Sequence, residues 1–166
     1  AGSDKRNTYS NEAAFKYFLL GAFASGFLLL GITFVYGGTG SFNTLQIASS
    51  SVLGAGVSKQ LLTIGLLLIL FAMAFKVSAV PFHFWTPDVY TGAPTVVTAY
   101  MSTIVKLGAL AGFYRLFSIV LVFDATTFTT TLIIISVLTI VVGNVIAASQ
   151  SNTKRLLAFS SIGHAG

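Results

Sequence analysis

The sequence predicts an all-α protein, a polytopic bundle of transmembrane helices in which one helix is broken at a proline. The chain is 55% hydrophobic and only 8% charged, whereas a soluble domain is about one quarter charged. Its apolar residues gather in runs close to the roughly 20 residues that a helix needs to cross a bilayer. Pro81 follows one of these runs, and an interior proline breaks or kinks a helix.

Four apolar runs are long enough for full spans, and a further helix begins near Thr153. The expected spans are about 13–36, 60–80, 95–118 and 128–149, with 153–166 as an incomplete fifth. Together they form one transmembrane domain over residues 1–166. The chain starts without a methionine and ends in SSIGHAG, which carries no stop signal. We therefore expect an internal piece of a longer protein.

The first span is expected to open after Ser10 or Asn11, because either side chain can cap a helix. Glu12 then lies in the first turn, where the helix dipole favours an anion. A cap or surface charge is the favoured interpretation of Glu12, and a proton-handling role is the alternative. Close approach of another helix is predicted at a face of small residues: Gly21, Ala22, Ser25 and Gly26.

Two lysines lie in long apolar stretches that contain no acidic residue. Lys76 ends the run 61–75, and Lys106 lies in the middle of 94–117. A cation in hydrocarbon is costly and rare unless the protein uses it, and a buried lysine, unlike arginine, can release its proton. Snorkelling to the headgroups is the alternative. It fits Lys106 poorly, because twelve residues of helix from Pro94 rise roughly 18 Å.

All three prolines lie within PFHFWTPDVYTGAP, residues 81–94. Pro81 has no N–H to donate to residue 77, so the helix should break or kink between 77 and 81. Broken helices in membranes occur where protein or water satisfies the freed backbone, and such places hold transport sites. An ordinary proline kink is the alternative, but a lysine beside the break favours a site. Pro87 and Pro94 are expected to be structural.

Polar and aromatic residues near the break have open roles. Asp88 is favoured as a turn-former or the cap of a short helix over a direct proton-transfer group. His83 is either a proton relay or a donor to an unpaired backbone carbonyl. The aromatic residues Phe84, Trp85 and Tyr90 fit an interfacial belt.

His164 is a second candidate relay, with a packing role as the alternative. It shares a helix face with Ser160 and Ser161 through three- and four-residue spacing. It lies about eleven residues from the expected helix start, roughly 16 Å deep.

The net charge of +5 follows membrane topology and does not indicate nucleic-acid binding. With a cytoplasmic N-terminus, Lys59 and Arg115 fall on the opposite side, as the positive-inside rule allows. The cytoplasmic side then holds five cations: Lys5, Arg6, Lys16, Lys154 and Arg155. The absence of cysteine excludes disulfides and iron–sulfur ligation within these residues. No metal-ligand cluster or glycine-rich phosphate loop occurs in the sequence, so we expect no cofactor, no metal and no redox chemistry in this chain.

Residues 75–117, FKVSAVPFHFWTPDVYTGAPTVVTAYMSTIVKLGALAGFYRLF, resemble the seventh and eighth transmembrane helices of the subunit N family of bacterial NADH:quinone oxidoreductase, respiratory complex I. SNEAAFKYFLLGAFASGFLLLGITFVYG is similar to the sixth helix, and NVIAASQSNTKRLLAFSSIGHAG to the ninth and the start of the tenth. The sister subunits and multisubunit sodium/proton antiporters typically read WLPDAH where this chain has WTPDVY (85–90). This difference favours the subunit N family over its paralogues.

The resemblance implies an antiporter-like fold and proton translocation driven by quinone reduction in other subunits of that enzyme. It assigns the family's proton-handling lysines to Lys76 and Lys106, with a partner glutamate upstream of Ala1 and a further lysine beyond Gly166. NADH, FMN, iron–sulfur clusters and quinone would belong to the parent complex. The implied partners are M-, K- and J-type membrane subunits and the lipid bilayer of the bacterial inner membrane. The rival functions are a cation/proton antiporter subunit and a purely structural membrane subunit.

Overall fold

The computed structural model describes residues 8–53, 58–120 and 125–166, which contain helices and no strand. The helices are α1 (Thr8–Thr39), α2 (Thr44–Leu53), α3 (Lys59–Val77), α4 (Trp85–Gly92), α5 (Thr95–Tyr100), the π-helical turn η1 (Met101–Val105), α6 (Lys106–Val120), α7 (Ala125–Ala148) and α8 (Thr153–Ala165). Four helical stretches within the described ranges are long and apolar enough to cross a membrane: 8–39, 59–77, 95–118 and 125–148. The predicted fold class, an all-α bundle of apolar spans, is confirmed.

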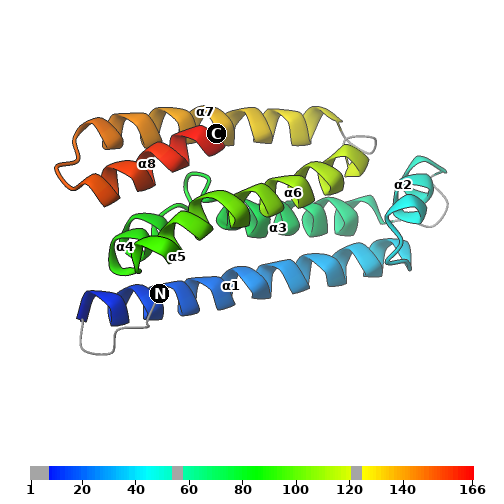
Figure 1. Ribbon diagram of the computed structural model, residues 1–166. Helices are drawn as coiled ribbons and strands as arrows, with labels where there is room; N and C mark the ends of the chain where they lie inside the picture. Colours follow the sequence, from blue (N-terminus) through cyan, green and yellow to red (C-terminus); the bar gives the residue numbers. More distant parts are fainter. Residues whose placement is uncertain (1–7, 54–57, 121–124) are drawn as a thin grey trace.

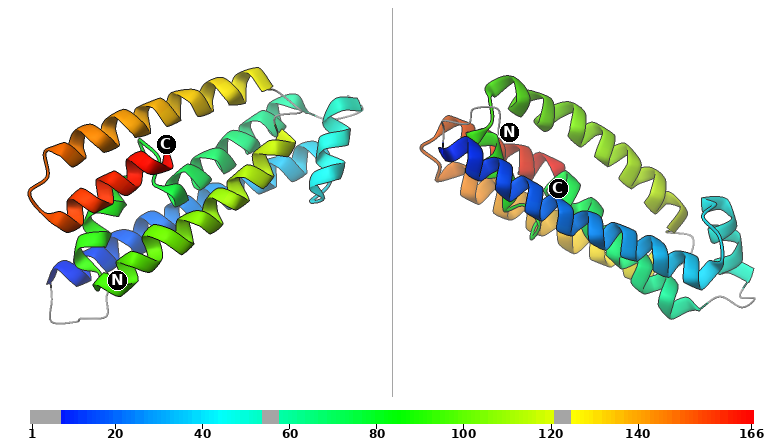
Figure 2. Two further views of the ribbon diagram at one scale, coloured as in Figure 1. Left: turned by 45° about the horizontal axis from the view of Figure 1, so that its top comes forward. Right: turned by 90° about the horizontal axis from the view of Figure 1, so that it is seen from below.

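The long helices lie side by side in an elongated bundle (Figure 1). α1 packs along α3, and α7 packs along α8. The short α4 contacts both α1 and α8 at one end of the bundle, while α2 lies at the opposite end (Figure 2). α4 therefore joins the first and last helices of the described chain.

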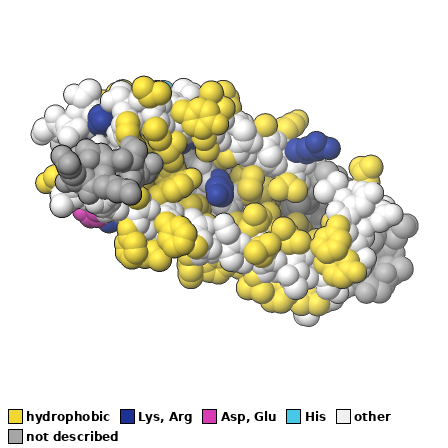
Figure 3. Space-filling view, turned by 60° about the horizontal axis from the view of Figure 1, so that its bottom comes forward, with side chains coloured by type: hydrophobic (Ala, Val, Ile, Leu, Met, Phe, Trp, Pro, Cys, Tyr) yellow, Lys and Arg dark blue, Asp and Glu magenta, His cyan; other side chains and the backbone are white. Residues whose placement is uncertain are grey.

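The buried core is built by α3 and the helices on either side of it. Leu62, Leu66 and Leu70 of α3 form one cluster with Phe117 of α6 and Phe128 of α7. Their spacing of four residues places the three leucines on one face of α3. The outer surface is also largely apolar, as Figure 3 shows for one face. Such a surface suits lipid or other membrane proteins.

α1 and α3 approach each other closely at a pair of glycines, Gly31 and Gly65. A Cβ added to Gly31 would lie 2.7 Å from the carbonyl oxygen of Gly65. A Cβ added to Gly65 would lie 2.8 Å from both the oxygen of Gly31 and the backbone nitrogen of Val35. A Cβ added to Gly21 or Gly26 would meet no described atom within 4 Å, so no helix of the described chain packs on the predicted small-residue face, and its role stays a prediction. Contact this close needs a glycine on both helices, and Gly65 is the only glycine of α3.

The first helix begins at Thr8, five residues earlier than expected. Ser10 and Asn11 are therefore inside α1 and do not cap it, and Glu12 lies beyond its first turn. Packing explains the extension. A Cβ added to Gly92, the last residue of α4, would lie 2.6 Å from the carbonyl oxygen of Tyr9. Contact with α4 stabilises this turn in the helical state, which overrides the weak local preferences of polar residues.

The predicted break between residues 77 and 81 is confirmed, because α3 ends at Val77. Ser78 follows in the left-handed conformation, with φ of 66°, which is common for the residue that ends a helix. Its hydroxyl accepts a hydrogen bond of 2.7 Å from the hydroxyl of Thr86 in α4. The span ends three residues before the expected boundary at 80, since the chain turns before it reaches Pro81.

Neighbouring helices satisfy the backbone groups that the break frees. The N–H of Val80 donates to Oγ1 of Thr139 in α7 at 3.0 Å. The carbonyl of Phe75 accepts from Nε1 of Trp85 at 3.1 Å. Pro87 is the third residue of α4, where a missing N–H costs little. Pro94 directly precedes α5, so both prolines lie at helix starts.

Candidate functional site

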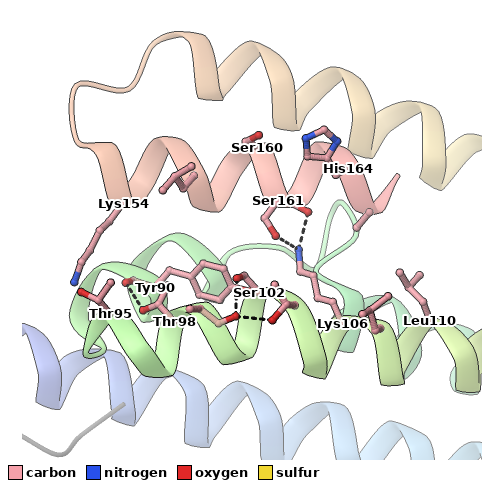
Figure 4. A pocket seen from close by; sticks show the side chains of 15 residues that line it. Tyr90, Thr95, Thr98, Ser102, Lys106, Leu110, Lys154, Ser160, Ser161 and His164 are labelled. Carbon is pink, nitrogen blue, oxygen red and sulfur yellow. Dashed lines mark hydrogen bonds between the residues drawn. The ribbon is translucent and has the colours of Figure 1, made fainter.

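Lys106 lies inside the bundle near the middle of the span 95–118 and is only 6% exposed. Its Nζ donates to the carbonyl oxygen of Ser161 at 2.7 Å and to the hydroxyl of Ser161 at 2.8 Å (Figure 4). The ion pairs found within the described ranges do not include Lys106. A buried ammonium normally needs a counter-charge or several hydrogen bonds. Both of these hydrogen bonds to the Lys106 ammonium come from a single residue of α8.

The turn just before Lys106 is π-helical, which the sequence reasoning missed. Residues 101–105 form this turn, so α5, η1 and α6 make one interrupted span. Two hydroxyls, Ser102 Oγ and Thr103 Oγ1, both donate to the carbonyl oxygen of Ala99, at 3.0 and 2.8 Å. Side-chain hydroxyls that bond to preceding carbonyls bend helices. The adjacent Ser102 and Thr103 were therefore the available signal, and π turns are frequent at functional sites.

A cavity of about 680 Å³ separates α5, η1 and α6 from α8. It extends past Lys106 from Lys154 in the first turn of α8 to His164 in its last. The lining carries two ammonium groups and no carboxylate. Its polar residues are Tyr90, Thr95, Thr98, Ser102, Thr103, Lys106, Lys154, Ser160, Ser161 and His164. The arrangement can hold water between the middle of the bundle and one of its ends.

Of the two candidate histidines, one lines the cavity that contains Lys106. His164 shares this lining with Ser161, but Figure 4 shows its ring on the side of α8 away from Lys106, whereas Ser161 points toward the lysine. In contrast, His83 lies in the break and is 8% exposed. Its ring lies 4.7 Å from that of Phe84 and 6.4 Å from that of Phe159. Its Nδ1 is buried and hydrogen-bonded to no described residue.

Lys76 lies in the last turn of α3 and is partly buried. Its ammonium forms no ion pair with the acidic residues of the described ranges. A cation at this position interacts favourably with the C-terminal end of the helix dipole. Lys76 does not line the cavity that contains Lys106. The structure thus places the two predicted lysines in separate surroundings.

Asp88 joins three helices through ion pairs. Its carboxylate lies 2.6 Å from Nζ of Lys16 in α1 and 3.4 Å from Nη2 of Arg155 in α8. Lys16 also pairs with Glu12, one turn earlier in α1, at 2.7 Å. Asp88 is the fourth residue of α4, whose N-cap is Phe84. It is therefore not the cap of the short helix, and its side chain links α4 to its two neighbours.

The aromatic residues after the break do not form the interfacial belt that the sequence predicted. Trp85 is 4% exposed and Tyr90 1%, while Phe84 is 70% exposed. The ring of Trp85 packs 5.2 Å from that of Tyr17 and 6.3 Å from that of Tyr90. The belt prediction was wrong for Trp85 and Tyr90, because α4 folds back between α1 and α8 and turns both rings inward.

A bundle of apolar spans with a broken helix and an internal lysine defines an antiporter-like membrane protein. The chain belongs to the family described as NADH:quinone oxidoreductase/Mrp antiporter, transmembrane, whose model matches residues 1–166.

Similar proteins agree with this assignment. NADH-quinone oxidoreductase subunit N of Cytophaga hutchinsonii is 50% identical over 166 residues, which is 100% of this chain and 35% of that protein. A chain of respiratory complex I from Thermus thermophilus, solved with bound aureothin, is 42% identical with a TM-score of 0.76, covering 98% of this chain and 34% of that one. A chain of the archaeal membrane-bound sulfane sulfur reductase is 32% identical with a TM-score of 0.84, covering 99% and 33%. The chain spans about a third of the length of the curated relatives it matches.

Proposed function

We propose that this chain is part of a proton-translocating membrane subunit of NADH:quinone oxidoreductase, of the subunit N type. Two of the relatives named above, from Cytophaga hutchinsonii and Thermus thermophilus, are subunits of that enzyme. The observation that carries the proposal is Lys106, a cation 6% exposed inside an apolar span. A charge inside a membrane span marks an ion or proton pathway unless it is paired or reaches the interface.

The proposed mechanism has three steps. A proton enters from the cytoplasmic side through water and polar groups near the break after α3. Lys76 holds it while paired with a glutamate supplied by another part of the subunit. Lys106 then receives the proton and passes it on along the membrane plane, away from α3. Lys106 suits the receiving role, because Ser161 provides hydrogen bonds to the ammonium without a fixed negative charge that would retain the proton.

The interaction free energy of one ion pair is large enough for such a mechanism. A partner charge at about 4 Å contributes on the order of 4 kcal/mol at an effective dielectric constant of 20. Every 1.4 kcal/mol is about tenfold in an equilibrium constant. Making and breaking a single ion pair at Lys76 can therefore change the equilibrium constant for proton binding to this lysine by about a thousandfold.

The proposal assigns redox chemistry to other subunits. NADH, FMN, iron–sulfur clusters and quinone are bound elsewhere in the complex, and this chain contributes no cofactor ligand. M-, K- and J-type membrane subunits are the proposed neighbours, in the bacterial inner membrane. Pro81, Pro87, Asp88 and Pro94 shape the break, while His83 and His164 remain candidate relays.

Replacement of Lys106 by methionine in the complete complex tests the proposal. We expect an assembled complex with lost proton pumping and with slow NADH oxidation that an uncoupler does not accelerate. Vesicles carrying the complex report both, through proton uptake and NADH absorbance. Lys59→Met, an exposed lysine at the start of α3, is the matched control and should pump normally. Normal pumping in Lys106→Met would contradict the proposal and favour a structural subunit.

A cation/proton antiporter is the second candidate, because the family description includes the Mrp antiporters. In an antiporter the same lysines would exchange sodium for protons. The segment WTPDVY, residues 85–90, and the subunit N relatives favour the oxidoreductase subunit. Proton uptake that requires sodium in the same vesicles would reverse this choice.

A further inference from the structure

Tyr90 is a buried polar residue that the proposed mechanism does not use. It is only 1% exposed, and its buried hydroxyl makes no well-aligned hydrogen bond to a described residue, although it lies close enough to the side chain of Ser161 to interact with it. A buried hydroxyl that lacks a protein partner is costly unless water satisfies it. Its position therefore requires an explanation beyond packing.

The surroundings of Tyr90 supply that explanation. The residue lines the 680 Å³ cavity together with Lys106 and Ser161. Figure 4 shows its ring extending from α4 along this cavity, on the side of Ser102 and toward Lys106. The cavity is large enough for several water molecules and is lined by enough hydroxyl groups to bind them. Water there can bond to the Tyr90 hydroxyl and to the Lys106–Ser161 pair at once.

We propose that Tyr90 is a proton-relay residue of the Lys106 site, joined to Lys106 and Ser161 through water in the cavity. The inference rests on the proposed function and adds a group to it. In each transfer the phenol oxygen binds a proton from water on one side as its own proton leaves to water on the other. One O–H bond forms as another breaks, and the tyrosine starts and ends neutral. The transferred proton finally binds Nζ of unprotonated Lys106.

The charge of the cavity favours a relay of this kind. Its lining already contains the ammonium groups of Lys106 and Lys154 and no carboxylate. A further group that became cationic would meet repulsion from both in surroundings of low dielectric constant. A hydroxyl that passes protons without a net charge avoids this cost.

The position of Tyr90 is fixed by neighbours on both sides of α4. Thr98 of α5 donates from Oγ1 to the backbone carbonyl of Tyr90 at 3.0 Å. The ring packs 6.3 Å from that of Trp85. A relay group needs a fixed position, because proton transfer requires hydrogen-bond geometry at each step.

Tyr90→Phe and Tyr90→His in the complete complex test the inference. Phenylalanine keeps the ring and removes only the proton-carrying oxygen, so we expect proton pumping and coupled NADH oxidation to fall by about tenfold or more. Histidine carries a proton as a cation, which the ammonium groups of Lys106 and Lys154 disfavour, so we expect it to recover little of the rate. A packing role predicts instead that phenylalanine, which keeps the ring, pumps normally.

Tyr17→Phe is the matched control, because Tyr17 also packs on Trp85 but does not line the cavity. It should pump at the wild-type rate. Normal pumping in Tyr90→Phe, while Lys106→Met abolishes pumping, would overturn the relay and leave the proposed function intact. Normal pumping in Lys106→Met would overturn the proposed function itself. Assembly of each variant is checked by native gel electrophoresis. If Tyr90→Phe fails to assemble while Tyr17→Phe assembles, the hydroxyl is structural and the relay is overturned.

Discussion

Two oxygen atoms of a single residue solvate the ammonium of Lys106. The carbonyl and hydroxyl of Ser161 both accept from Nζ, at 2.7 and 2.8 Å. Hydrogen bonds to a charged group contribute about 1.5–3 kcal/mol each. The balance between protonated and neutral Lys106 therefore depends on one side chain of α8 as well as on burial.

Ser161→Ala removes the hydroxyl and leaves the carbonyl in place. We expect coupled NADH oxidation to slow by about tenfold, the effect of one hydrogen bond to a charged group, and less than in Lys106→Met. Steady-state rates in vesicles measure the change. Ser118→Ala is the control, because Ser118 lies on the Lys106 helix, is exposed and donates to the backbone carbonyl of Arg115 in its own helix. Equal rates in both variants would mean that the Ser161 hydroxyl does not affect the lysine.

Asp88→Asn tests whether the Asp88 carboxylate is structural or carries protons. Asparagine keeps the shape but loses the charge that pairs with Lys16 and Arg155. Since partly exposed ion pairs contribute little, about 1 kcal/mol or less each, we expect a lower melting temperature and unchanged protons pumped per NADH. Thermal unfolding of the purified complex and the pumping ratio measure the two effects. Glu12→Gln, which affects only a pair within α1, should lower the melting temperature less.

The sequence identified the chemistry of the site better than its geometry. Lys106 was predicted from the cost of a charge in an apolar run, and burial agrees with that argument. Ser161 and His164 were predicted to share a face, and both line the cavity. Tyr90 was assigned to an interfacial aromatic belt, because the composition of a segment does not reveal that it folds back into the bundle. The roles of all these residues in proton transfer stay predictions.

At the scale of elements, the packing of the helices depends on two glycines and on the break after α3. α1 and α3 touch through backbone atoms at Gly31 and Gly65, so neither helix can move closer or accept a side chain there. The break after Val77 lets α4 reach from α3 to α1 and α8. The break follows from Pro81 and was predictable. The position of the contact was not, because it depends on which glycines of two helices meet.

Gly65→Ala should destabilise the packing of α1 on α3. The new Cβ would lie 2.8 Å from the backbone oxygen of Gly31 and nitrogen of Val35, and backbone atoms cannot easily move away. We expect a loss of about 1–3 kcal/mol, typical of overpacked interiors. Thermal unfolding of the purified complex measures the loss.

Gly21→Ala is the matched control for Gly65→Ala. The structure shows no described atom within 4 Å of its added Cβ, and alanine is the better helix former by roughly 0.5–1 kcal/mol. It should therefore be neutral or slightly stabilising. Destabilisation by both variants would indicate that Gly21 meets another part of the complex.

At the scale of the whole molecule, the charged groups of the described residues other than Lys76 and Lys106 lie toward the two ends of an apolar bundle. Lys16, Asp88 and Arg155 meet at the end that holds α4, whereas Lys59 begins α3 at the other end, beside α2. Lys5 and Arg6, which were expected on the cytoplasmic side, lie outside the described residues. The separation fits a bundle that crosses a membrane with the α4 end in the cytoplasm, as the positive-inside rule predicts.

Cysteine labelling tests this orientation, since the chain has no cysteine of its own. Ser151→Cys lies between α7 and α8, and Thr44→Cys lies at the start of α2, and both positions are exposed. In a complex whose other accessible cysteines are removed, a membrane-impermeant maleimide should label Ser151→Cys only from the cytoplasmic side. It should label Thr44→Cys only from the opposite side. Labelling of both from one side would contradict a membrane-spanning bundle with this orientation.

The π-helical turn before Lys106 has a consequence for how this span compares between relatives. A wide turn of this kind accommodates one more residue than the α-helical turn it replaces. Each residue of an α-helix accounts for about 100° of rotation. Removing one residue from 101–105 would therefore turn Lys106 by about a quarter of a circle relative to α5, away from α8. In evolutionary terms, a relative that lost this single residue would have lost the orientation of its lysine, although its sequence would still contain one.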